Sequence, residues 1–85
     1  MEIKIEIPEY NSEKGLHCKW ENGFEIEITI NKEQILLEAN RAGLISLATQ
    51  LLTLAQQNVP AGAHFHYDSY NSLEPGSKEL VVTKK

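Results

Sequence analysis

Residues 40–57 read NRAGLISLATQLLTLAQQ, and this run predicts a single helix from about Arg41 to Gln57. Asn40 is a favourable N-cap residue, and the run 59–62 (Val-Pro-Ala-Gly) ends the helix. With about 100° between successive residues, the apolar side chains gather on one side, which we expect to pack on a sheet. That apolar side consists of Leu44, Ile45, Leu47, Ala48, Leu51, Leu52, Leu54 and Ala55.

The opposite side of this helix is polar but uncharged. No charged residue occurs between Ala42 and Asn58, although exposed helices usually carry Lys and Glu. The polar side consists of Ser46, Thr49, Gln50, Thr53, Gln56 and Gln57.

Alternating segments before the helix predict strands. Residues 2–7 alternate isoleucine with charged residues, and residues 16–20 and 24–30 alternate in the same way. A three-residue loop at 21–23, with Gly23 left-handed, joins the latter two segments into a hairpin that pairs Trp20 with Phe24 in the core. The same register turns Cys18 inward. A further short strand is expected at 35–38.

Two more strands, 64–68 and 79–83, follow the helix. We therefore predict an α+β fold with the order ββββαββ: a mostly antiparallel sheet of five to six strands with one helix packed on one face. Residues 1–85 are expected to form a single domain.

Charge and composition exclude several classes of function. The net charge of −4 belongs entirely to residues 1–30, which carry seven acids and three lysines. This favours a basic protein partner and argues against nucleic acid. No apolar run is long enough to span a bilayer, and the acidic, alternating start is unlike a signal peptide. One cysteine cannot form an internal disulfide, which indicates the cytoplasm.

The run HFHYD at 64–68 is the best candidate for chemistry. Alternation places His64, His66 and Asp68 on the open face, where they are similar to a two-histidine, one-carboxylate metal set. The favoured interpretation is plainer, namely that these groups hydrogen-bond to each other and to loop backbone. We predict no catalytic residue, no metal and no cofactor. Glu25 and Glu27 project from the same open face towards a partner.

Three runs resemble a known family. They are AGLISLATQLLTLA (42–55), PAGAHFHYD (60–68) and LEPGSKELVV (73–82). Over roughly residues 35–84 the pattern resembles the small immunity proteins of bacterial polymorphic toxin systems, in the family numbered thirty-two. The resemblance implies an α+β domain that binds and neutralises a cognate toxin in the producing cell. It places His64, His66 and Asp68 at the family's polar strand motif.

The leading hypothesis is therefore an immunity protein whose partner-binding residues are Glu25, Glu27, His64, His66 and Asp68. One alternative is a small metal-binding or hydrolytic domain that uses the histidine strand. The other is a homodimeric structural module joined through its open sheet face or its helix.

Overall fold

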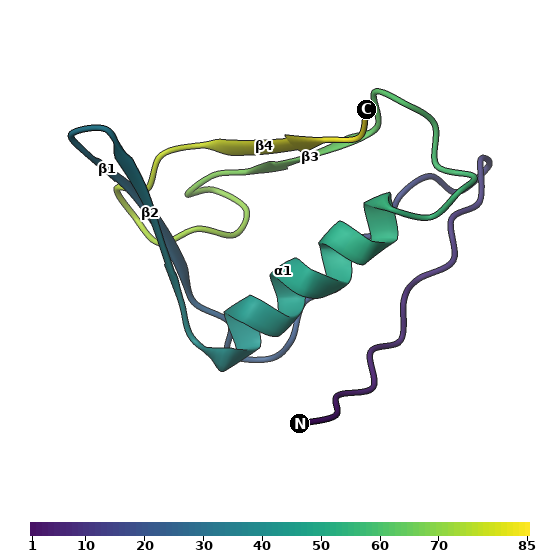
Figure 1. Cartoon of the computed structure of the whole chain (residues 1–85), viewed down its shortest axis with the longest axis horizontal. Helices are drawn as coiled ribbons and strands as arrows, with labels where there is room; N and C mark the ends of the chain where they lie inside the picture. The colour runs from purple at the N-terminus through teal and green to yellow at the C-terminus, as the bar shows by residue number, and fades with distance from the viewer.

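The computed structural model describes all of residues 1–85 and contains one helix and four strands. The elements are β1 (Ile26–Asn31), β2 (Gln34–Ala39), α1 (Arg41–Leu54), β3 (His64–Tyr67) and β4 (Leu80–Thr83). The fold is α+β, but the predicted sheet of five to six strands is wrong. β1 pairs with β2 and β3 with β4 in two separate antiparallel pairs, and Figure 1 shows the first pair standing across one end of α1 and the second lying along it.

β1 and β2 form a hairpin around a tight turn at Lys32 and Glu33. The strands close at Asn31 and Gln34, and Lys32 adopts a positive φ of 58°. Alternation in β1 buries Ile26 and Ile28 and exposes Glu27, as the sequence predicts.

A loop from the end of the chain occupies the outer edge of β1. The Glu74 amide donates to the Ile26 carbonyl (2.8 Å) and the Lys78 amide to the Ile28 carbonyl (2.8 Å). The Ile28 amide donates to the Ser77 hydroxyl (3.2 Å). Because β2 takes the other edge, residues 16–20 have no edge of β1 to pair with, and the predicted first hairpin does not form.

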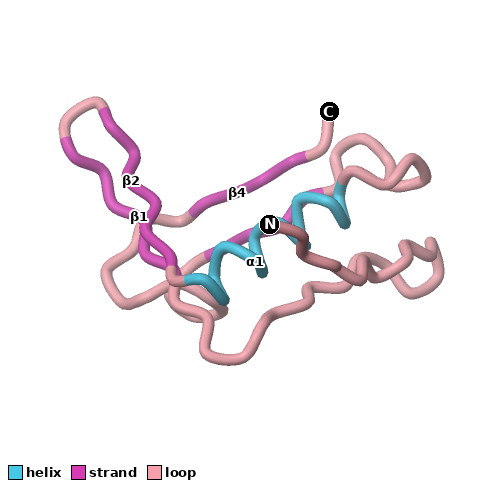
Figure 2. Tube along the Cα trace, turned by 60° about the horizontal axis from the view of Figure 1, so that its bottom comes forward, coloured by secondary structure: helices cyan, strands magenta, loops and turns pink.

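Residues 1–25 contain no strand, so the predicted strands at 2–7 and 16–20 are both wrong. This N-terminal segment instead passes alongside α1, as the long loop beside the helix in Figure 2 shows. Part of the predicted turn survives, because Gly23 has a φ of 77° and the Phe24 amide donates to the Glu21 carbonyl (3.3 Å). Trp20 stacks on Phe24 with ring centroids 4.4 Å apart, although both residues are half-buried and outside any strand. Cys18 is exposed, contrary to its predicted place in the core.

The helix starts as predicted and ends three residues early, at Leu54. Asn40 is its N-cap: the Asn40 Oδ1 accepts from the Gly43 amide (2.8 Å) and from the Glu25 amide (3.0 Å). Asn40 therefore fixes the helix start against the residue that leads into β1. No helix of the structure combines the length and the apolar character that crossing a membrane requires.

The two sides of α1 are largely exchanged relative to the prediction. Four side chains of the polar side are fully or almost fully buried, whereas three leucines of the apolar side stay about half exposed and Leu54 is the one residue of that side in the core. The buried polar residues are Ser46, Thr49, Gln50 and Thr53, and the exposed leucines are Leu44, Leu51 and Leu52.

Hydrogen bonds explain why the polar side can be buried. The hydroxyls of Ser46, Thr49 and Thr53 donate to carbonyls four residues earlier, at 2.7–2.8 Å. The Gln50 Nε2 donates to the Lys19 carbonyl (3.1 Å), and the Ser46 hydroxyl accepts from the Glu21 amide (2.8 Å). These side chains give the backbone of the N-terminal segment partners that a sheet would otherwise supply.

The core lies between α1, the hairpin and the β3–β4 pair. It consists of Ile26, Ile28, Leu54, Val59, Phe65, Tyr67 and Leu73. Phe65 and Tyr67 point inward from β3 while His64 and His66 point outward, as predicted from their alternation.

Candidate functional site

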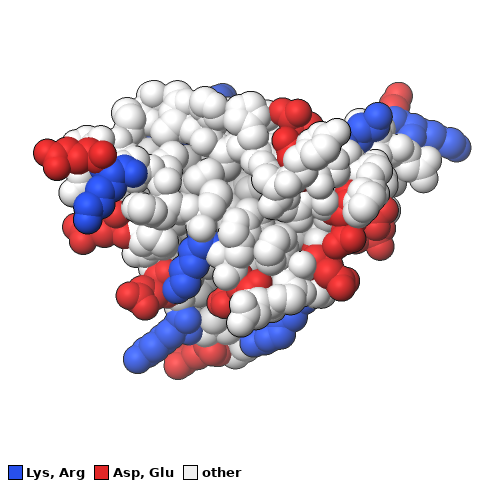
Figure 3. Space-filling model, turned by 180° about the vertical axis from the view of Figure 1, so that it is seen from behind, with Lys and Arg blue, Asp and Glu red and all other residues white.

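Four glutamates surround an open hollow of about 270 Å³ at the base of the hairpin. Glu25 immediately precedes β1, Glu27 lies in β1, Glu38 comes from β2 and Glu74 from the loop between β3 and β4. Ile26, Ala39 and Asn40 complete the lining, and no Lys or Arg is among them. We call this feature the acidic hollow. Figure 3, which views the molecule from behind, shows acidic side chains gathered beside the hairpin.

The strand register creates this concentration of charge. Glu27 lies directly opposite Glu38 in the β1–β2 ladder, and like charges in that position destabilise a sheet slightly. Glu74 joins them because its amide is tied to the Ile26 carbonyl. The single ion pair of the structure joins His66 and Glu79, so no base neutralises the four carboxylates. The hollow is therefore suited to a cationic side chain brought by a partner.

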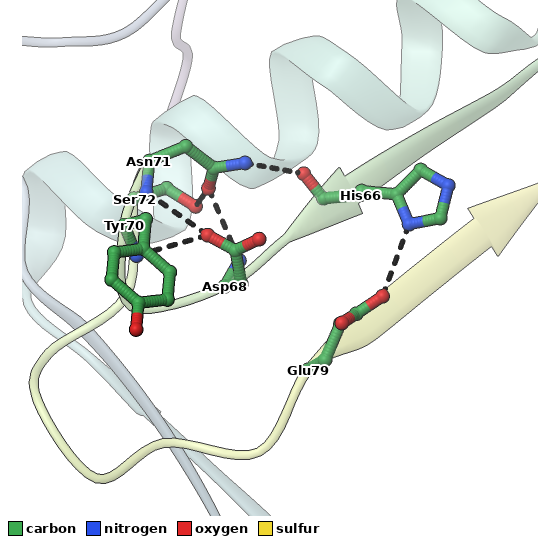
Figure 4. Close-up of polar contacts among 6 residues, drawn as sticks. All are labelled: His66, Asp68, Tyr70, Asn71, Ser72 and Glu79. Carbon is green, nitrogen blue, oxygen red and sulfur yellow. Dashed lines mark hydrogen bonds and ion pairs between the residues drawn. The ribbon is translucent and has the colours of Figure 1, made fainter.

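The second candidate set consists of His64, His66 and Asp68 on the outer side of β3, and only the two histidines lie together. The rings of His64 and His66 lie edge to face, with centroids 4.9 Å apart. The His64 Nδ1 is 2.8 Å from the Gly62 carbonyl oxygen, and the His66 Nδ1 is 3.1 Å from the Glu79 Oε1 (Figure 4). Both imidazoles therefore already have a local partner.

Asp68 is separated from the histidines because it caps a turn. Its Oδ1 accepts from the amides of Tyr70 (2.9 Å) and Asn71 (3.1 Å), as Figure 4 shows. The Asn71 side chain adds two hydrogen bonds: its Oδ1 accepts from the Asp68 amide (3.1 Å), and its Nδ2 donates to the His66 carbonyl (3.0 Å). Asp68 thus shapes the loop that follows β3. No three His, Cys, Asp or Glu side chains converge in the geometry that holds a metal ion.

Two groups have displaced pKa values, and burial is the main cause in both. Desolvation raises the pKa of the Cys18 thiol, although the residue as a whole is exposed, so the thiol stays protonated at neutral pH. Burial, with a smaller contribution from nearby Cys18, raises the pKa of Tyr67 far above its usual value. Neither group is displaced in the direction that activates a nucleophile or a base.

The structure brings Glu25 and Glu27 together and adds two residues that were not predicted. A two-residue turn at Lys32 and Glu33 is enough to place Glu38 opposite Glu27, so the sequence held a signal for Glu38. Glu74 arrives through a long-range contact with β1, and no local pattern in the sequence indicates it.

Comparison with known proteins gives one match. Neither the curated proteins nor the solved structures contain a match to this chain. The family model described as immunity protein 32 matches residues 34–85, which include β2, α1, β3 and β4. This agrees with the resemblance seen over residues 35–84, and it covers more than half of the chain. The chain therefore belongs to the immunity protein 32 family.

Proposed function

We propose that this chain binds and neutralises a cognate protein toxin in the cytoplasm of the bacterium that makes both. The observation that carries the proposal is the family match over residues 34–85. In this proposal residues 1–85 act as one immunity domain, without catalysis and without a cofactor. Neutralisation then follows from occupancy alone, because a bound partner blocks the toxin surface that it covers.

The acidic hollow supports a basic toxin surface as the partner. Lys or Arg side chains that enter the hollow meet carboxylates from three separate segments of the chain. A cation between Glu27 and Glu38 is attracted to both carboxylates, and these attractions offset their mutual repulsion. Complementary charge also speeds the encounter of the two proteins.

The outer side of β3 extends this recognition surface. His64 and His66 are exposed, and Glu79 next to them follows the loop that pairs with β1. We assign the contact to the two imidazoles and a supporting role to Asp68, whose carboxylate is engaged by the turn amides.

The test begins with the gene directly upstream. A large toxin gene there supplies the partner, and its toxic domain should kill cells that lack this chain and spare cells that express it. Purified toxic domain and chain are then mixed in a stopped-flow instrument over a range of salt concentrations. Added salt should slow association steeply.

A charge-reversal variant locates the contact. Glu25→Lys/Glu27→Lys should slow association several-fold at low salt, and the difference should shrink at high salt. Glu9→Lys/Glu13→Lys is the matched control, because it changes the charge equally at exposed positions outside the hollow. A flat salt response with equal rates for both variants would reject the acidic hollow as the toxin-binding surface.

A further inference from the structure

The outer side of α1 is an apolar surface that toxin binding at the acidic hollow leaves unused. Leu44, Leu51 and Leu52 are 54%, 51% and 49% exposed there. No segment of the chain passes in front of the helix in Figure 1. No charged residue lies between Ala42 and Asn58, so the helix presents no charge to a partner beyond Arg41 at its start.

Four residues form one straight line along this outer side. Leu44, Ala48, Leu51 and Ala55 follow the spacing +4, +3, +4, which places them on a single helical stripe. We call them the leucine–alanine stripe. Within the stripe the two leucines project furthest from the helix, and the two small alanines leave shallow gaps beside them.

The spacing of the stripe is the same when the helix is reversed end for end, but the leucines and alanines exchange places. If two copies of α1 lie antiparallel, Leu44 falls opposite Ala55 of the other copy and Ala48 falls opposite Leu51. Every large side chain then meets a small one, the arrangement in which helix ridges enter grooves. Parallel helices would set leucine on leucine and alanine on alanine, with a gap at each alanine.

We propose that a second copy of this chain packs on the leucine–alanine stripe, with the two α1 helices antiparallel. The charge distribution favours a second copy at this surface. Each chain carries a net charge of −4, so two copies repel each other wherever their acidic surfaces meet, and the uncharged stripe avoids that repulsion. Arg41 also comes to lie beside the C-terminal end of the other helix, where a cation is favoured.

The size of the stripe sets the strength of this dimer. α1 has 14 residues and is therefore about 21 Å long. A strip about 21 Å long and about 10 Å wide, one helix diameter, covers a much smaller area than the ~800 Å² that each partner contributes to a standard stable interface. We therefore expect a weak dimer with a dissociation constant in the micromolar range. Asn40 lines the acidic hollow and begins the helix, so the pair leaves one hollow free at each end.

Sedimentation equilibrium of the purified chain alone tests the proposal, from about 1 µM to about 1 mM. The wild-type chain should change from monomer to dimer over this range. Ala48→Glu and Leu51→Lys should each raise the dissociation constant at least about tenfold, because each buries charges in the apolar contact. Ser69→Glu adds the same charge as Ala48→Glu at an exposed loop position and should leave the constant unchanged. Circular dichroism verifies that each variant is folded.

Mixing the two variants tests the antiparallel register. Residue 48 of one copy faces residue 51 of the other, so an Ala48→Glu chain and a Leu51→Lys chain should associate more tightly with each other than either does with itself. A mixture no tighter than its components overturns the register. A wild-type chain that stays monomeric, or variants that dimerise like wild type, overturns the second copy as the occupant and leaves the stripe to a different protein.

Discussion

The two sides of α1 differ in a way that hydrophobicity alone does not explain. The side rich in Ser, Thr and Gln is buried, and the side rich in Leu is half exposed. The buried side faces the N-terminal segment, whose backbone is irregular and needs hydrogen-bond partners. The leucines of the outer side stay about half exposed to solvent. The comparison shows that the hydrogen-bonding needs of a neighbouring segment can decide which side of a helix is covered.

Neighbouring residues on the two sides give the largest expected contrast. Gln50 is fully buried and donates to the Lys19 carbonyl, whereas Leu51 is 51% exposed. We expect Gln50→Ala to lower the free energy of unfolding by about 2 kcal/mol, because it opens a cavity and leaves the Lys19 carbonyl without its partner. Leu51→Ala should lower it by less than about 1 kcal/mol, since half of its side chain is already in water.

Urea denaturation at low protein concentration measures both variants without contribution from a dimer. The Gln50 Oε1 has no hydrogen-bond partner, so its removal offsets part of the loss and sets the modest figure for Gln50→Ala. If Leu51→Ala is the costlier change, the apolar side is the buried one and the comparison fails.

Gly43 sharpens the comparison, because alanine in place of glycine should destabilise the inner side of α1, whereas alanine is the more stable residue on the outer side. A Cβ at this buried position would lie 2.6 Å from the Glu25 carbonyl oxygen and 2.9 Å from the Ile26 Cγ1. Gly43→Ala should therefore lower the free energy of unfolding by about 1–3 kcal/mol, although alanine favours a helix over glycine. On the outer side Ala48→Gly should lower it by about 1 kcal/mol through helix propensity alone.

Thermal and urea unfolding of the two variants provides the measurement. A stabilised Gly43→Ala protein would mean that the helix does not approach β1 as closely as these distances indicate.

Local patterns in the sequence predicted the elements whose partners lie nearby. The N-cap Asn40, the alternation in β3 and the inward position of Phe65 depend on neighbours within a few residues, and all three are confirmed. The wrong strands at 2–7 and 16–20 alternate just as well. The segment 16–20 fails because the loop at 74–78, more than 50 residues away, holds the edge of β1 with which it was predicted to pair, and the segment 2–7 has no strand partner either. Alternation indicates which side of a segment is apolar, but a strand also needs a free edge.

The candidate site residues also divide into those that local alternation indicates and those that only a long-range contact brings to the site. Glu25, Glu27, His64 and His66 were named from alternation, and their roles in binding remain proposals. Glu74 could not be found because only a long-range hydrogen bond brings it to the hollow. The helix sides were misassigned because the hydrogen bonds of Gln50 and Ser46 reach residues 19 and 21, which the sequence pattern had placed in a strand and in the hairpin loop that follows it.

Tyr67 extends the comparison to β3, whose inner side contacts the same N-terminal segment. Its ring meets Trp20 edge to face, with centroids 6.0 Å apart, and burial raises its pKa. The folded protein therefore holds the phenol proton more tightly than the unfolded chain does. Stability is unaffected below about pH 10 and should fall above it by up to about 1.4 kcal/mol per pH unit.

The pH dependence is measured by urea unfolding in a Cys18→Ser background, because the raised pKa of Cys18 adds a loss of the same sign. Tyr67→Phe should flatten the decline above pH 10. Tyr70→Phe, at a side chain that is almost fully exposed, is the control and should leave it in place. Equal declines in both variants would show that the inner side of β3 is open to water.

His66 provides the smallest expected effect, on the outer side of the same strand. It is joined to Glu79 at 3.1 Å, and the two side chains are 52% and 56% exposed. An ion pair so accessible to water contributes little, so His66→Ala and Glu79→Ala should each change the free energy of unfolding by less than about 0.5 kcal/mol. A double-mutant cycle that combines the two substitutions should give a coupling energy equally small. Phe65→Ala, one residue away on the inner side, should by contrast lower the free energy of unfolding by about 3 kcal/mol.

If His66→Ala destabilises the protein as much as Phe65→Ala does, then the outer side of β3 holds the fold together, and the histidines are not free to contact a toxin. If stability is unchanged while association with the toxin slows, the outer side serves recognition and the inner side serves folding.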